Sequence, residues 1–230
     1  MDYKKNVKYF ENKKIMLYGS AVLLAVGVIL WFGPFWSRDN YFVMYIFSVL
    51  SIIVGGIIFA VTLGSRSTDK KIDEQINEAF KHFEEETLQK NDLYERQLPY
   101  VESALIEGYK YYDGSFLHRD KDGKYRTDIY FKTHVYFTEE GLCLGSKEVS
   151  LIKDEQNDKS EQIPYVTIKS AYLSEDETVY VKGNKTVPVK YQTLHIAKTD
   201  DSEFISQVKS SQAVDTLVSD INHIRERKVL

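Results

Sequence analysis

The sequence predicts a membrane-anchored α+β protein. Two transmembrane helices form a hairpin near the N-terminus, and a cytoplasmic domain of about seven β-strands, capped by a C-terminal helix, follows. Apolar residues are concentrated before Leu63, whereas nearly everything after Gly64 is polar, and beyond Pro99 apolar residues alternate in the period of β-strands. The chain-wide averages of 43% hydrophobic and 28% charged residues conceal this division.

Two stretches without Asp, Glu, His, Lys or Arg predict the membrane hairpin. One runs from Ile15 to Trp36 and the other from Tyr41 to Leu63, and each meets the roughly 20 apolar residues that a bilayer core requires. Backbone amides in lipid must pair within their own segment, so both stretches are expected to be helical. Without a charged residue inside the membrane, ion or proton transport by this chain alone is not expected.

Basic residues beside the two helices predict their orientation. The connecting loop holds Arg38, offset by Asp39, whereas the flanking segments hold Lys4, Lys5, Lys8, Lys13, Lys14, Arg66, Lys70 and Lys71. The excess of positive charge on one side places both termini in the cytoplasm, at the cytoplasmic membrane.

Small residues at three-to-four-residue spacing predict the face on which the two helices pack. They are Ala21, Ala25, Ser51, Gly55, Gly56 and Ala60. Such residues let helix backbones approach closely, either within the hairpin, which is favoured, or across a homodimer.

Residues 1–14 form a basic N-terminus, and residues 99–230 form the domain. A third helix is expected between the membrane hairpin and the domain, in the juxtamembrane segment of residues 65–98. The apolar positions of this helix, Ile72, Ile76, Phe80 and Phe83, recur at helical spacing, and Pro99 ends the helix. Packing on the domain is the favoured role of this stripe, followed by a coiled-coil dimer contact and then by in-plane lipid binding. The same four residues are candidates for partner binding.

The β-rich part contains seven predicted strands, separated by turns such as Asp122-Gly123 and Glu140-Gly141. The runs are Ala104 to Tyr112, Tyr125 to Thr138, Gly141 to Ser146, Val166 to Leu173, Thr178 to Lys182, Val187 to Ala197 and Glu203 to Val208. The charged stretch from Lys153 to Gln162 is expected to be a loop. A closing amphipathic helix follows, with Ser211 as its N-cap.

Residues 135–142 (VYFTEEGL) and residues 163–170 (IPYVTIKS), followed by the closing helix, resemble the pattern of bacterial pleckstrin-homology-like (PH-like) domains. Some members of those families carry the domain behind two transmembrane helices, as expected here. The resemblance implies an antiparallel β-barrel or sandwich that binds or scaffolds and does not catalyse.

A group of basic residues resembles the headgroup site of related eukaryotic domains. Its members are Lys110, Arg119, Lys121, Lys124 and Arg126. Clustered Arg and Lys are suited to phosphate, but four aspartates lie among them, so an ordinary solvated hairpin is the favoured interpretation.

No catalytic motif is recognised, the five histidines are scattered, and we expect no metal site and no cofactor. The single cysteine, Cys143, lies in a strand pattern without an adjacent activating histidine. The net charge of −4 gives no reason to expect nucleic-acid binding.

The sequence therefore supports a non-enzymatic, membrane-integral protein that presents its domain to a protein partner. Alternatives are a sensor of a lipid headgroup or small ligand, and a subunit or immunity-type protector of a membrane complex. A homodimer and binding to anionic lipid are two separate further expectations.

Overall fold

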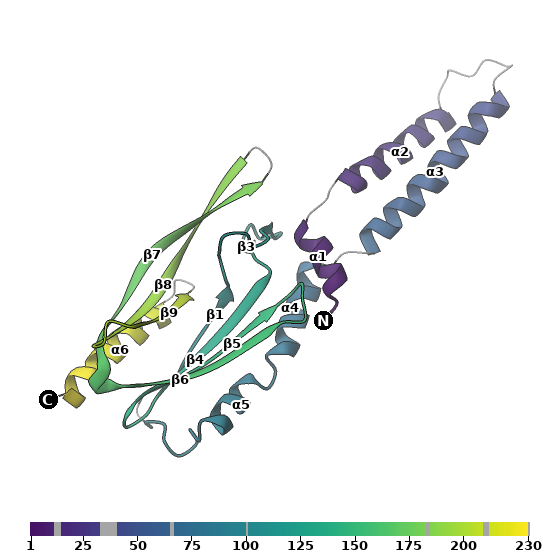
Figure 1. The fold of residues 1–230 in the computed structure, drawn as a ribbon. Helices are drawn as coiled ribbons and strands as arrows, with labels where there is room; N and C mark the ends of the chain where they lie inside the picture. The colour runs from purple at the N-terminus through teal and green to yellow at the C-terminus, as the bar shows by residue number, and fades with distance from the viewer. Residues whose placement is uncertain are drawn as a thin grey trace. The chain divides into compact units, whose positions relative to one another are not determined.

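A computed structural model describes residues 1–11, 15–32, 41–64, 67–99, 101–182, 185–208 and 212–229 (Figure 1). The chain divides into two compact units, Asp2–Thr68 and Asp69–Leu230, which we call the helical unit and the β unit. From Asp69 onward, the predicted juxtamembrane segment is therefore part of the same unit as the strands. The predicted outer loop, residues 37–40, and Ser211 lie outside the described residues.

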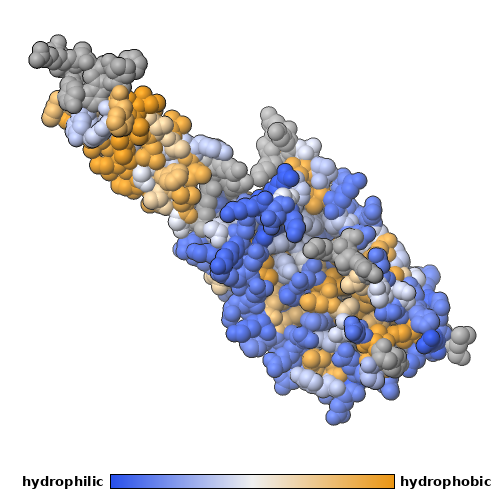
Figure 2. All heavy atoms as spheres, turned by 180° about the vertical axis from the view of Figure 1, so that it is seen from behind, coloured by the Kyte–Doolittle hydropathy of each residue, from blue (hydrophilic) through white to orange (hydrophobic). Residues whose placement is uncertain are grey.

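The helical unit contains α1 (Tyr3–Glu11), α2 (Ile15–Phe32) and α3 (Tyr41–Gly64). The sequence analysis did not predict α1. By length and composition, one helix in the described residues could cross a membrane, the stretch that begins at Phe42 and includes α3; the apolar part of α2, Leu17–Phe32, is shorter. Apolar surface dominates this unit in Figure 2. The two-span topology and its orientation therefore stay predictions.

Helices α2 and α3 meet along a seam of small and polar residues. The Ser48 hydroxyl donates to the Gly27 carbonyl oxygen across 2.7 Å, and both residues are buried. A Cβ on Gly27 would lie 2.7 Å from Ile52 Cγ1, and one on Gly55 would lie 3.1 Å from Leu24. The helices are therefore as close as glycine permits at these two levels.

This seam differs from the predicted one. Gly55 belongs to it and Ser51 and Gly56 are half-buried, but Ala21, Ala25 and Ala60 are exposed. Small residues recur on several faces of both helices, so their spacing does not determine which face is turned inward. The hydrogen bond of Ser48 and the close contact at Gly27 mark that face instead.

The β unit opens with α4 (Asp69–Ala79) and α5 (Phe83–Lys90), where one continuous helix was predicted. Both pack on the domain's own sheet. The Phe80 ring lies 5.8 Å from that of Tyr130, and the Phe83 ring lies 5.3 Å from that of His134. The predicted partner-binding stripe, including Ile72 and Ile76, is at most 7% exposed. Partner binding by this stripe is therefore wrong, because the protein covers these side chains itself.

Two larger antiparallel sheets and one two-stranded sheet follow (Figure 1). The first has the order β1-β4-β5-β6, from Ala104–Tyr109, Ile129–Phe137, Gly141–Ser150 and Gln156–Pro164. The second has the order β7-β8-β9, from Ile168–Lys182, Lys185–Lys198 and Glu203–Val208. A 3-10 turn, η1 (Tyr165–Thr167), connects the two larger sheets. The short strands β2 (His118–Arg119) and β3 (Tyr125–Arg126), which lie between β1 and β4 in the sequence, pair with each other.

Helix α6 (Gln212–Val229) completes the core. Its Leu217 and Ile221 are buried with residues of both sheets, such as Val135 and Leu194. The Asn222 amide bonds both the N–H and the C=O of Ala171, which fixes the helix beside β7. The expected strand-rich domain with a closing helix is confirmed at this level.

Candidate functional site

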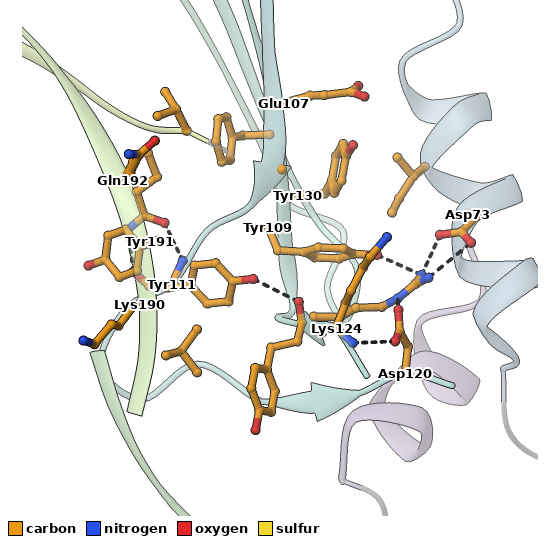
Figure 3. Close-up of a pocket in the computed structure, with 18 of the residues that line it drawn as sticks. Asp73, Glu107, Tyr109, Tyr111, Asp120, Lys124, Tyr130, Lys190, Tyr191 and Gln192 are labelled. Carbon is orange, nitrogen blue, oxygen red and sulfur yellow. Dashed lines mark hydrogen bonds and ion pairs between the residues drawn. The ribbon is translucent and has the colours of Figure 1, made fainter. Parts of the chain in front are cut away.

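The β unit contains a cleft of about 800 Å³, within the range of small-ligand sites (Figure 3). Residues from α4, β1, β3, β4, β8 and β9 form its walls. Five tyrosines are among them: Tyr109, Tyr111, Tyr125, Tyr130 and Tyr191. Its lining residues come from both of the larger sheets, so the cleft lies between them.

Side-chain contacts explain why the cleft stays open. The Gln207 amide bonds the N–H and the C=O of Tyr111 at 2.7 and 2.6 Å, which satisfies the backbone just beyond β1 without another strand. Tyr111 stacks on Tyr191 with ring centroids 5.5 Å apart. Gly108 adds no side chain above Phe131, a floor residue. Apolar floor and aromatic walls together suit a flat ligand.

Arg126 joins one wall together. Its guanidinium contacts Asp73 at 2.5 Å, Asp120 at 3.1 Å and the Tyr109 hydroxyl at 3.0 Å. Burial alone would raise the pKa of Asp120, but hydrogen bonds from Arg126 and from the Lys124 N–H lower it. Because two carboxylates already surround it, Arg126 is a structural cation here and not a free anion receptor.

Some of the remaining charged side chains in the cleft form ion pairs, and others do not. Glu107 pairs with Lys132 at 2.7 Å and accepts a hydrogen bond from Tyr130. Lys124 and Lys190 line opposite walls, and within the described part of the chain their ammonium groups have no ion-pair partner (Figure 3). The cleft thus offers free positive charge, with Glu175 as an exposed carboxylate at its border.

The hydroxyls of Tyr109, Tyr111 and Tyr130 remain protonated at neutral pH. Burial is the main cause that raises the pKa of Tyr111 to about 12, and it also raises the pKa values of Tyr109 and Tyr130. Neutral hydroxyls do not repel an anion, although the Tyr111 hydroxyl already donates to the Tyr125 carbonyl oxygen and the Tyr130 hydroxyl to Glu107.

The five predicted basic residues do not converge. Lys110 pairs with Glu148 at 2.7 Å, and Arg119 donates to the Gly123 carbonyl oxygen while lying over the Tyr125 ring. Lys121 is exposed and does not line the cleft. Only Lys124 and Arg126 do, and Arg126 is neutralised. The predicted headgroup cluster is therefore corrected to one lysine from this group, joined by Lys190 from β8.

The tyrosines are the part of the site that sequence reasoning missed. Tyr109, Tyr111 and Tyr112 follow one another at the end of a predicted strand, in a chain with 17 tyrosines. That local density is the signal that was available, although it does not reveal that β4 and β8 contribute further rings.

A second polar group lies on the other sheet. Ser174 Oγ is 2.9 Å from His195 Nε2, and His195 Nδ1 is 3.1 Å from Glu203. The Ser174 hydroxyl also donates to Asp176 at 3.1 Å, so its proton is directed away from the histidine. Hydrogen bonds from Thr193 and Ser174 lower the pKa of Asp176. This geometry is that of a structural hydrogen-bond chain and not of an activated serine.

Neither metal nor thiol chemistry is indicated in the described ranges. They contain no group of three or more His, Cys, Asp or Glu residues placed to hold a metal ion. Cys143 is 1% exposed beside Leu93 and Tyr136, and burial raises the pKa of its thiol, which disfavours the reactive thiolate.

Comparison with protein-family models, with curated proteins and with solved structures found no match to this chain.

Proposed function

We propose that this chain is a membrane-anchored, non-catalytic binding protein whose tyrosine-lined cleft holds a small ligand with a flat apolar body and an anionic group. The observation that carries the proposal is the unequal engagement of charges. Arg126 forms ion pairs with Asp73 and Asp120, whereas Lys124 and Lys190 have no ion-pair partner among the described residues.

The aromatic walls support a flat body for this ligand. The ring of Tyr111 is supported by Tyr191, and that of Tyr109 packs edge-on against Tyr130 at 5.1 Å. Rings held in this way lose little freedom when a planar ligand stacks on them, so the stacking energy is retained as affinity.

The arrangement of strands supports a PH-like assignment as part of the same proposal. Four antiparallel strands in the order β1-β4-β5-β6 precede three in the order β7-β8-β9, and one helix closes the chain. The β2-β3 hairpin then corresponds to an insertion between the first two long strands. A domain of that kind binds or scaffolds, which agrees with a cleft and with no supported catalytic group among the residues that the structure describes.

Titration calorimetry on the full chain in lipid nanodiscs tests the ligand class. Naphthalene-2-sulfonate should bind, whereas 2-naphthyltrimethylammonium, with the same ring and opposite charge, should bind at least tenfold more weakly. Lys124→Gln and Lys190→Gln should each weaken sulfonate binding about fivefold, as expected for a solvent-accessible charge pair. Lys81→Gln, an exposed lysine outside the cleft, is the matched control. Equal binding of both probes, or no effect of either lysine, would refute the anionic class.

We further infer that α2 and α3 together form a two-span anchor with both termini in the cytoplasm. Support comes from the absence of Asp, Glu, His, Lys and Arg in α2, from its packing along α3, and from the lysines that flank the pair. A membrane-impermeant maleimide should label Ser37→Cys in intact cells and Ile205→Cys only after lysis. Labelling of Ile205→Cys in intact cells would reverse the orientation.

Docking of a protein partner is a second candidate. The outer face of the second sheet exposes Tyr172 by 42% and Ile205 by 59%, in one row across His195. Cross-linking in native membranes should then recover a partner that Ile205→Asp loses and Lys124→Gln retains. Recovery of the same proteins with both variants would count against this surface.

A further inference from the structure

The end of the β7-β8 hairpin leaves apolar side chains in solvent. Val179 is 50% exposed and Val181 is 77% exposed, and Pro188, paired opposite Val179, is exposed as well. Side chains alternate along a strand, so these three share one face of the ribbon, while Tyr180 and Val189 occupy the other and are buried.

The buried face fixes the ribbon in place. The Tyr180 hydroxyl bonds Ser115 Oγ at 2.8 Å and accepts the Tyr112 N–H at 3.2 Å. The hairpin therefore cannot bury its valines by turning over without losing these bonds, and its apolar face is held ready for an external surface.

The charge of this segment is opposite to that of the whole chain. The paired ribbon of residues 178–189 contains Lys182 and Lys185 and no Asp or Glu, whereas the chain has a net charge of −4. Exposed valines on a basic ribbon match the interface of an anionic bilayer, where apolar groups enter at headgroup level and ammonium groups meet lipid phosphates.

We propose that the end of the β7-β8 hairpin contacts the surface of an anionic lipid bilayer through Val179 and Val181. The chain contains a helix long enough to cross a membrane, so the hairpin works at a high effective lipid concentration and a weak contact suffices. This inference is independent of the cleft, because Val179 and Val181 do not line it.

The test uses the full chain in nanodiscs of phosphatidylcholine, alone or mixed with phosphatidylglycerol. Val181→Cys carries an environment-sensitive fluorophore, and Cys143 does not compete because it is buried. Headgroup spin-labelled lipid should quench this fluorophore in the anionic discs only. Lys182→Gln and Lys185→Gln should each lower the contact equilibrium about fivefold, and Val179→Ser should lower it further.

Ile205→Cys is the matched control. Ile205 is 59% exposed on the same sheet, but it lies beside His195 and the acidic Glu203 and not on the basic ribbon. Absence of quenching at position 181 in anionic discs would overturn the proposal, as would equal quenching at position 205. A fluorescence change that needs several chains per disc and no anionic lipid would assign the valines to a contact between copies and would also overturn it. Near-UV circular dichroism unchanged from the parent chain establishes that each variant is folded.

Discussion

Gly145 on β5 offers a direct test of how α5 packs on the sheet. A Cβ added there would lie 2.2 Å from Thr87 Cγ2 and 3.2 Å from Thr87 Cβ. Because Gly145 does not have a positive φ, alanine itself is not strained at this position. The substitution therefore acts through the contact with the helix.

The expected size follows from two opposing effects. Overpacking in a filled interior costs about 1–3 kcal/mol, whereas replacing glycine restricts the unfolded chain and returns about 0.4–1 kcal/mol. Gly145→Ala should thus lower the free energy of unfolding of the β unit by about 1–2 kcal/mol, which lowers Tm by roughly 2–8 °C for a domain of this size.

A double-mutant cycle separates the clash from other effects. Thr87→Ala removes the colliding methyl group, so Gly145→Ala combined with Thr87→Ala should be about 1 kcal/mol more stable than the sum of the single changes predicts. Gly108→Ala is the control, because its nearest foreign atom would be 3.8 Å away.

Calorimetry or near-UV circular dichroism of the full chain suits this measurement. Tryptophan emission does not, since both tryptophans, Trp31 and Trp36, precede the β unit. Additive changes, or a Gly145→Ala variant as stable as the parent, would refute the packing of α5 on β5.

Three further predictions concern other contacts. Arg126→Leu should destabilise the β unit by about 3 kcal/mol in denaturant titrations, because it leaves Asp120 buried without its cation. Since the pKa of Asp120 is lowered from 3.8, the stabilisation by its carboxylate exists above pH 4 and is lost as the pH falls through the lowered value. The free energy of unfolding of the variant should therefore depend less on pH in the acidic range. Gly27→Val should weaken the helical unit by about 1–3 kcal/mol in detergent unfolding followed by Trp emission, whereas Ala25→Val, at an exposed site, should not. The pKa of Tyr111 is raised to about 12, so the stability that its neutral hydroxyl contributes should be retained below pH 10 and lost between about pH 10 and 12. Tyr111→Phe should reduce that loss in absorbance titrations.

Periodicity predicted the elements with one dominant apolar face. The strand Glu203–Val208 has the predicted bounds, and the closing helix lies where Leu217 and Ile221 recur. Apolar periodicity did not predict the elements that tertiary packing stabilises without a local pattern. Gln156–Pro164 is a strand although it is charged, because pairing with β5 stabilises it and most of its side chains face water, with Ile163 in the core.

Two other differences have similar causes. The polar residues 174–177 suggested a turn between two strands, but they continue β7 as one 15-residue strand paired to β8. In the juxtamembrane segment, the helical stripe identified Phe80 and Phe83 as contact residues without revealing that the helix breaks between them.

The candidate site was predictable only in part. Lys124 and Arg126 were singled out from their basic character, and both line the cleft. Their opposite roles depend on Asp73, which is 53 residues away in sequence from Arg126. A linear pattern does not carry that information, and the same holds for Lys190, which the second sheet brings to the opposite wall.

The outermost strand of the first sheet bears on how crowded copies of this protein behave. Strand β6 places Asp158, Lys159 and Glu161 in solvent or at its border, and Glu161 is already held by Lys198. Joining a foreign strand there would strip water from alternating charges without offering them new partners. Copies of this chain at high concentration should consequently resist aggregation through this edge strand.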